Sequence, residues 1–107
     1  MIFLGVQLMR TVIETVAFQK QADPLWSREE RHAFIDWIAA NPNVGDVIPN
    51  AHGARKVRWG RRGIGKRSGV RVIYFHLDTD EVVLLIMIYA KSARSNAGPE
   101  EIKWSES

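Results

Sequence analysis

Hydrophobic positions along the chain predict four β-strands. Residues 11–18 are rich in β-branched and aromatic side chains, and residues 54–59 alternate between apolar and charged positions. Residues 70–77 form a further apolar strand, and residues 81–90 are the most apolar run of the chain. We expect the last three segments to form an antiparallel meander, with residues 81–90 as a central strand covered on both faces.

One helix is predicted between the first two strands. Ser27 and Glu30 match a capping box, in which the serine hydroxyl and the glutamate side chain satisfy free backbone amides at a helix start. We expect the helix to begin near Arg28 and to end at Asn41-Pro42, because proline disfavours helical geometry in the residue before it. Its apolar positions form one stripe that could pack on a sheet. The stripe consists of Ala33, Phe34, Trp37 and Ile38.

The connecting segments contain turn-forming residues. The stretch up to Gly53 holds two prolines and two glycines, which predicts a loop. Residues 60–69 combine glycines with basic side chains, which predicts a flexible basic hairpin connection. Asp78-Thr79-Asp80 predicts a turn, and residues 99–101 resemble the first turn of a short helix. The expected apolar anchors of the first loop are Val44, Val47 and Ile48.

The size of the chain suits one domain. Its 107 residues are 46% hydrophobic, which is enough for a single modest core. We place that domain at residues 11–104, after an N-terminal extension (residues 1–10) and before a tail (residues 105–107). The apolar opening lacks a preceding basic region and is far shorter than the roughly 20 residues of a membrane span, so we read no export or anchoring signal there. The absence of cysteine excludes a disulfide framework and a thiol nucleophile, and makes a reducing cytoplasm the simplest setting.

Positive charge is concentrated in one segment. Eight of the fifteen Lys and Arg residues lie between Arg55 and Arg71, with no Asp or Glu among them, although the formal net charge of the chain is only +3. Such a block suggests a polyanionic partner, because phosphate neutralisation supplies much of the affinity in nucleic-acid binding. Alternation within residues 54–59 places Lys56 and Arg58 on one face of a strand and Val57 and Trp59 on the other. Two cations would therefore project from one side of a sheet whose other side joins the core.

Four segments taken together resemble a known family. They are GDVIP (residues 45–49), GARKVRW (53–59), GKRSGVRVIYF (65–75) and LLIMIYAK (84–91). In this combination and order they resemble the RelE/HigE toxins, and most closely the HigB branch. The resemblance covers about residues 11–101.

The resemblance implies a fold, a reaction and partners. The fold would be α+β, with helical elements packed on one face of a twisted antiparallel sheet. The protein would be the toxin of a type II toxin–antitoxin system that cleaves messenger RNA in the ribosomal A site, by attack of the neighbouring 2′-hydroxyl, without a metal or other cofactor. Its partner would be a HigA-like antitoxin with a helix-turn-helix domain, and operator DNA would be bound only through that antitoxin.

The family's functional positions carry over in part. The resemblance assigns catalytic roles to Lys56 and Arg58 on the second strand, to Arg71 at the start of the third, and to Lys91 after the last strand. In the best-known branch the last region also carries a second cation and a catalytic tyrosine, and here Ser92 and Gly98 stand at those positions. That departure puts a tyrosine-dependent step in doubt.

The four cations could divide the chemistry of RNA cleavage among them. The reaction needs a proton acceptor for the 2′-hydroxyl, cations at the crowded phosphorus and a donor for the leaving 5′-oxygen. Arg71 suits the scissile phosphate because its planar fork binds phosphate in a bidentate manner. Lys56 is our candidate base, which requires surroundings that favour its neutral amine, and Lys91 would assist the leaving group. Further RNA contacts are expected from Arg55, Arg61, Arg62, Lys66, Arg67, Tyr74, Tyr89 and Arg94.

Other interpretations remain open at this stage. The basic block could be a solvated loop, and Tyr74 and Tyr89 could pack in the core instead of stacking on bases. His52 and His76 could suggest a histidine-dependent nuclease, and the carboxylates of residues 78–81 a cation site, although a turn accounts for the latter. A ParE-like toxin that inhibits a topoisomerase, or a non-catalytic nucleic-acid-binding module, would share much of this pattern.

Overall fold

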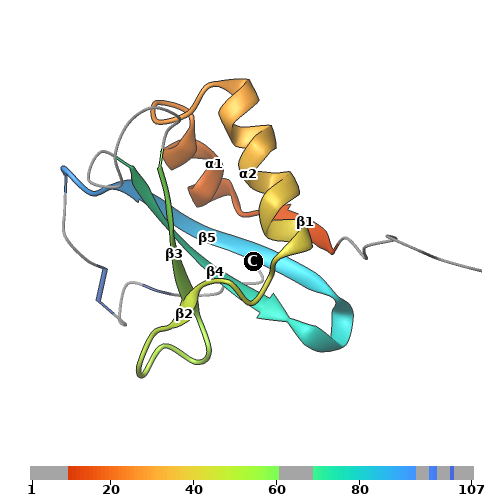
Figure 1. Ribbon diagram of the computed structural model, residues 1–107. Coiled ribbons are helices and arrows are strands. Elements are labelled where there is room, and N and C mark those ends of the chain that lie inside the picture. Colours follow the sequence, from red (N-terminus) through yellow and green to blue (C-terminus); the bar gives the residue numbers. More distant parts are fainter. Residues whose placement is uncertain (1–9, 61–68, 94–96, 99–101, 103–107) are drawn as a thin grey trace, which may run out of the picture.

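The protein folds into a five-stranded sheet with two helices on one of its faces (Figure 1). The structure is a computed structural model that describes residues 10–60, 69–93, 97–98 and 102. The expected N-terminal extension, basic hairpin and C-terminal helical turn therefore lie largely or wholly outside the described residues. The elements are β1 (Thr11–Glu14), α1 (Val16–Ala22), α2 (Arg28–Ala40), β2 (Asp46–Val47), β3 (Arg55–Trp59), β4 (Val70–Leu77), a 3-10 turn (Asp78–Asp80) and β5 (Val82–Ala90).

The sheet has the strand order β1-β5-β4-β3-β2. The pairs β3–β4 and β4–β5 are antiparallel, which confirms the expected meander. The expected central strand, β5, is an interior strand between β1 and β4, and the middle strand of the sheet is β4. The first strand departs from expectation, because β1 pairs with β5 in parallel, with Thr11 opposite Val82. The sheet is therefore mixed. The helices carry the chain across one face from β1 at one edge to β2 at the other, which lets β1 enter beside the last strand.

The prediction of a strand through Phe18 is wrong beyond Glu14. Thr15 begins a helix instead, with its side-chain oxygen accepting a hydrogen bond from the backbone N–H of Phe18 at 3.1 Å. Phe18 and Ala22, one helical turn apart, are buried, while Val16 is exposed. A local cap and the burial of one helical face therefore outweigh the β-propensity of this stretch.

The second helix confirms the capping-box prediction. The Ser27 hydroxyl accepts from the Glu30 N–H and the Glu30 carboxylate accepts from the Ser27 N–H, both at 3.1 Å. The helix begins at Arg28 and ends before Asn41. Phe34 and Ile38 of the predicted stripe are buried, whereas Ala33 is exposed.

A hydrophobic core fills the space between the helices and the sheet. Phe18, Phe34 and Ile38 pack there against alternate residues of β3, β4 and β5. The Phe34 ring lies 5.1 Å from the ring of Trp26 and 5.4 Å from that of Trp59, measured between centroids. We call the sheet surface that faces this core the helix face, and the opposite surface the far face.

A second apolar cluster lies on the far face. Ile73, Phe75 and Leu84 of the central strands pack there against the buried Ala51 and Ala54 of the loop before β3 and against Ala97 and Ile102 near the C-terminus. The expected anchors Val44 and Val47 are 46% and 56% exposed, and only Ile48 packs against this cluster. Small alanines fit close to the sheet here, so they take the place of the predicted valines.

Candidate functional site: a cation cluster on the far face

Strand alternation places two arginines side by side on the far face. Val57 and Val72 are buried in the helix-face core, so their neighbours Arg58 and Arg71 point to the other side of the sheet. The two arginines are directly opposite each other in the β3–β4 pairing, and Tyr89 of β5 is opposite Arg71. Arg58, Arg71 and Tyr89 therefore form one row across three strands.

The two lysines lie near this row. Lys56 is two positions along β3 from Arg58 and on the same face, which separates their Cα atoms by about 7 Å. Lys91 follows the end of β5, and its N–H donates to the Gly69 carbonyl at 3.3 Å, next to the start of β4. We call Lys56, Arg58, Arg71 and Lys91 the cation cluster. The structure thus brings together at one end of the sheet four residues that the sequence spreads over 36 positions.

Arg71 is the buried residue of the cation cluster and lies in the middle of the row, between Arg58 and Tyr89. Its side chain is buried, with only 5% of the residue exposed. This burial, together with the charge of Arg58, lowers the pKa of Arg71, while Tyr89 acts in the opposite direction. An arginine nevertheless stays protonated at neutral pH. A buried cation with a like charge directly opposite is unfavourable, and a bound phosphate would relieve both costs.

Asp46 also belongs to this region, although the sequence reasoning did not select it. It is directly opposite Lys56 in the antiparallel β2–β3 pair, so both side chains project from the same face. The segment GDVIP was visible in the sequence as part of the resemblance. The pairing of Asp46 with Lys56 was not, because it depends on the register of a two-residue edge strand.

Arg55 lies on the other side of β3 and is engaged with the backbone. Its guanidinium donates to the carbonyl of Gly45 at 2.7 Å and to that of Asn43 at 3.3 Å. This arginine therefore holds the loop before β2 against the sheet. Its position does not suit the RNA contact that we expected of it.

Tyr74 is a core residue in the structure. It is fully buried on the helix face, and its hydroxyl donates to the Pro42 carbonyl at 2.8 Å and accepts from the Gly45 N–H at 2.9 Å. Burial, the largest effect, raises the pKa of Tyr74. A Cβ on Gly45 would come within 2.9 Å of the Tyr74 ring, so glycine permits this close approach. The buried position corrects the expectation that Tyr74 contacts RNA.

The histidines lie away from the cation cluster. His76 is near the opposite end of β4 from Arg71, and its Nδ1 is 2.8 Å from the side-chain oxygen of Asn43. His52 lies in the loop before β3 and His32 on α2. Within the described parts of the chain, no group of three or more His, Cys, Asp or Glu side chains is arranged to hold a metal ion. Of the residues expected to contact RNA, Arg61, Arg62, Lys66, Arg67 and Arg94 lie outside the described residues.

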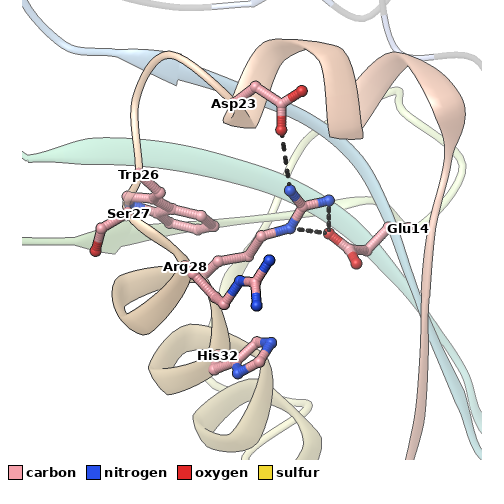
Figure 2. A pocket seen from close by; sticks show the side chains of 7 residues that line it. Glu14, Asp23, Trp26, Ser27, Arg28 and His32 are labelled. Atoms are coloured by element: carbon pink, nitrogen blue, oxygen red, sulfur yellow. Dashed lines mark hydrogen bonds and ion pairs between the residues drawn. The ribbon is translucent and has the colours of Figure 1, made fainter.

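A separate depression of about 480 Å³ lies where the end of β1 meets the end of α1 and the start of α2 (Figure 2). Arg31 of α2 forms ion pairs there with Glu14 at 2.8 Å and with Asp23 at 3.1 Å. Arg28 and His32 extend from the same helix into this region. The ion pairs connect β1, α1 and α2, which indicates a structural role.

Comparison with solved structures identifies the architecture. The free E. coli toxin RelE, in an arginine-to-alanine mutant form, superimposes with a TM-score of 0.60 at 19% sequence identity, covering 79% of this chain and 86% of that one. The fold is that of the RelE toxins.

Two complexes have chains of the same fold. A RelBE-type toxin–antitoxin complex from Mycobacterium tuberculosis contains a chain that matches with a TM-score of 0.59 at 16% identity, covering 77% of this chain and 98% of that one. The intact E. coli RelBE toxin–antitoxin complex contains one that matches with a TM-score of 0.54 at 20% identity, covering 74% and 93%. No protein-family model matches the sequence. Among the described residues, no helix is long and apolar enough to cross a membrane.

Proposed function

We propose that this RelE-fold protein is the toxin of a type II toxin–antitoxin system and an endoribonuclease that cleaves messenger RNA on the ribosome in the cytoplasm. The observation that carries the proposal is the cation cluster on the far face, centred on the buried Arg71. Strand pairing holds its like charges side by side, and such a concentration of positive charge suits a polyanion. The resemblance of the sequence to the HigB branch supports the choice of RNA as that polyanion.

The proposed reaction is attack of a 2′-hydroxyl on the adjacent phosphorus. Arg71, with Arg58 beside it, binds the phosphate and stabilises the charge that develops on its oxygens. Lys91 stabilises or protonates the leaving 5′-oxygen. The proton acceptor is Lys56 or Asp46, which are directly opposite each other at the edge of the cluster. The carboxylate of Asp46 is the stronger candidate, because it can accept a proton without first losing one.

The ribosome would supply the rest of the catalysis. A cluster of cations with one adjacent carboxylate is a weak nuclease site, and bending of the message into an in-line geometry would lower the barrier. The proposed partner that keeps the toxin inactive is a HigA-like helix-turn-helix antitoxin. Two of the solved structures with this fold are toxin–antitoxin complexes, which supports an antitoxin partner.

The proposal is tested by mapping message 5′ ends in a cell-free translation system by primer extension. Wild-type protein should create new ends that require translating ribosomes. Arg71→Ala and Lys91→Ala should reduce these ends at least tenfold, because each removes a charge from the reacting phosphate. Lys20→Ala, which removes an exposed cation from α1 on the helix side, is the matched control and should cleave normally.

The possible results separate the candidate functions. Intact messages in the presence of folded protein would refute the nuclease proposal. Loss of topoisomerase activity in the same extract would then favour a ParE-like toxin. If the wild-type protein instead binds RNA and Arg71→Ala weakens that binding, a non-catalytic nucleic-acid-binding module would be favoured. Strong cleavage of naked RNA would contradict the ribosome's proposed contribution.

A further inference from the structure

A β-bulge in β5 changes which residues face the cation cluster. Ile73 of β4 is opposite Met87, but the next residue, Tyr74, is opposite Leu85, so Ile86 is an extra residue with no partner in β4. Before the bulge, Leu85 points to the helix face. Uninterrupted alternation would send Met87 and Tyr89 to that same face. The extra residue reverses the phase, so both point to the far face.

The bulge is supported by side chains from the helix layer. The Thr15 hydroxyl, just before α1, lies 3.0 Å from the Leu85 carbonyl and 3.4 Å from the Ile86 carbonyl. On the other side of the bulge, the Ile88 N–H donates to the side-chain oxygen of Gln21 at 3.0 Å. Backbone groups around the bulge are therefore hydrogen-bonded, which indicates that the bulge is a stable part of the fold.

The result of the phase reversal is that Tyr89 lies directly beside Arg71. The two residues are cross-strand partners, 6% and 5% exposed. Directly opposite residues on one face have Cβ atoms about 5 Å apart, and Tyr89 acts to raise the pKa of Arg71. Arg58 is the neighbour of Arg71 on the other side. Arg71 thus has Arg58, whose charge lowers its pKa, as the neighbour on one strand and Tyr89, which acts in the opposite direction, as the neighbour on the other.

We propose that Tyr89 is a positioning residue, whose hydroxyl orients the Arg71 guanidinium for binding a phosphate. The attraction from one side and the repulsion from the other restrict the guanidinium to fewer orientations than an isolated arginine would have. Such a restriction reduces the entropy lost on phosphate binding. The identity of the phosphate as that of RNA rests on the proposed function, whereas the pairing of Tyr89 with Arg71 does not.

The first test measures the order of the arginine without any ligand. Tyr89→Phe keeps the ring and removes the hydroxyl. We expect the Arg71 side-chain Nε–H in NMR spectra, assigned by its absence in Arg71→Ala, to exchange with water severalfold faster in Tyr89→Phe, while the unfolding temperature changes by no more than a few degrees. An unchanged Arg71 signal in a folded Tyr89→Phe protein would overturn the proposal.

The second test is a double-mutant cycle on the binding of a fluorescein-labelled single-stranded RNA of ten nucleotides at fixed ionic strength. Tyr89→Phe should weaken binding about fivefold in the wild-type background, as expected for loss of one polar interaction, and have no effect in the Arg71→Ala background. Equal effects in both backgrounds would mean that Tyr89 acts independently of Arg71, which contradicts the proposal. Tyr89→Leu serves as a comparison that removes ring packing as well.

The two proposals can fail separately. If wild-type protein does not cleave messages but the NMR and binding measurements show coupling of Tyr89 to Arg71, the nuclease proposal fails and the positioning role stands. The opposite result is that wild-type protein cleaves messages and Tyr89→Phe has the same Arg71 Nε–H exchange rate, the same RNA affinity and the same cleavage activity. In that case the positioning role fails and the nuclease proposal stands. The NMR comparison decides the positioning role even for a protein that binds no RNA.

Discussion

Removal of one hydroxyl group tests how the edge of the cation cluster is held in place. The hydroxyl of Tyr74 connects the centre of the sheet to the loop before β2, through the Pro42 carbonyl and the Gly45 N–H. Asp46, the residue after Gly45, begins β2 and is opposite Lys56. Tyr74→Phe preserves the ring in the core and deletes both hydrogen bonds, so we expect it to destabilise the fold and to loosen this loop.

The size of the effect follows from the burial of these groups. Each of the two hydrogen bonds contributes about 1 kcal/mol net, and a buried N–H left without an acceptor adds a desolvation cost of about 1 kcal/mol or more. Tyr74 is 0% exposed, so water does not easily replace the lost hydroxyl. We expect a loss of about 2–3 kcal/mol in the free energy of unfolding. For a domain of this size that corresponds to a fall of roughly 10–20 °C in Tm.

The assay is urea and thermal unfolding followed by circular dichroism. Tyr89→Phe makes the same chemical change at the only other tyrosine of the chain. We expect it to cost less than about 1 kcal/mol, because it removes no hydrogen bond of comparable geometry. If Tyr74→Phe loses less than about 0.5 kcal/mol, or no more than Tyr89→Phe does, the reasoning that these two bonds hold the loop is refuted.

Two further predictions concern the stability of the fold. Burial raises the pKa of Tyr74 above its ordinary value of 10.0, so the folded protein keeps this proton to higher pH than the unfolded chain does. The free energy of unfolding should therefore be unaffected by this group below pH 10 and fall as the pH rises above that value. If the free energy of unfolding of Tyr74→Phe falls as steeply with pH as that of the wild type, this assignment is contradicted. Ser27→Ala removes half of the capping box of α2 and should cost about 1 kcal/mol in urea unfolding, whereas Ser27→Thr should retain most of the stability; equal losses in the two variants would show that the cap contributes little.

Several elements were predictable because their signals are local. The start of α2 depends on Ser27 and Glu30, three residues apart, whose side chains satisfy each other's backbone amides before any tertiary contact forms. The far-face position of Arg58 follows from strand alternation and the apolar character of Val57. For the same reason the meander of β3, β4 and β5 could be expected, since it joins neighbours in sequence.

Other features depend on contacts between distant parts of the chain. The segment from Val16 has the composition of a strand, and it is helical because the helix buries Phe18 and Ala22 in the core. Tyr74 and Tyr89 looked equivalent in the sequence, yet Tyr74 is in the helix-face core and Tyr89 is in the far-face cluster beside Arg71. Tyr89 is only 6% exposed, so the expected stacking on RNA bases is contradicted for both tyrosines. The bulge at Ile86 produces that difference, and no local sequence pattern predicts the bulge.

The sequence by itself therefore determined the start of α2 and the three-strand meander, because the first depends on residues three positions apart and the second joins strands that follow one another along the chain. Only the tertiary structure decided the parallel pairing of β1, the pairing of Asp46 with Lys56 and the row formed by Arg58, Arg71 and Tyr89. These arrangements depend on strand register, which is set by how both faces of the sheet are packed at once.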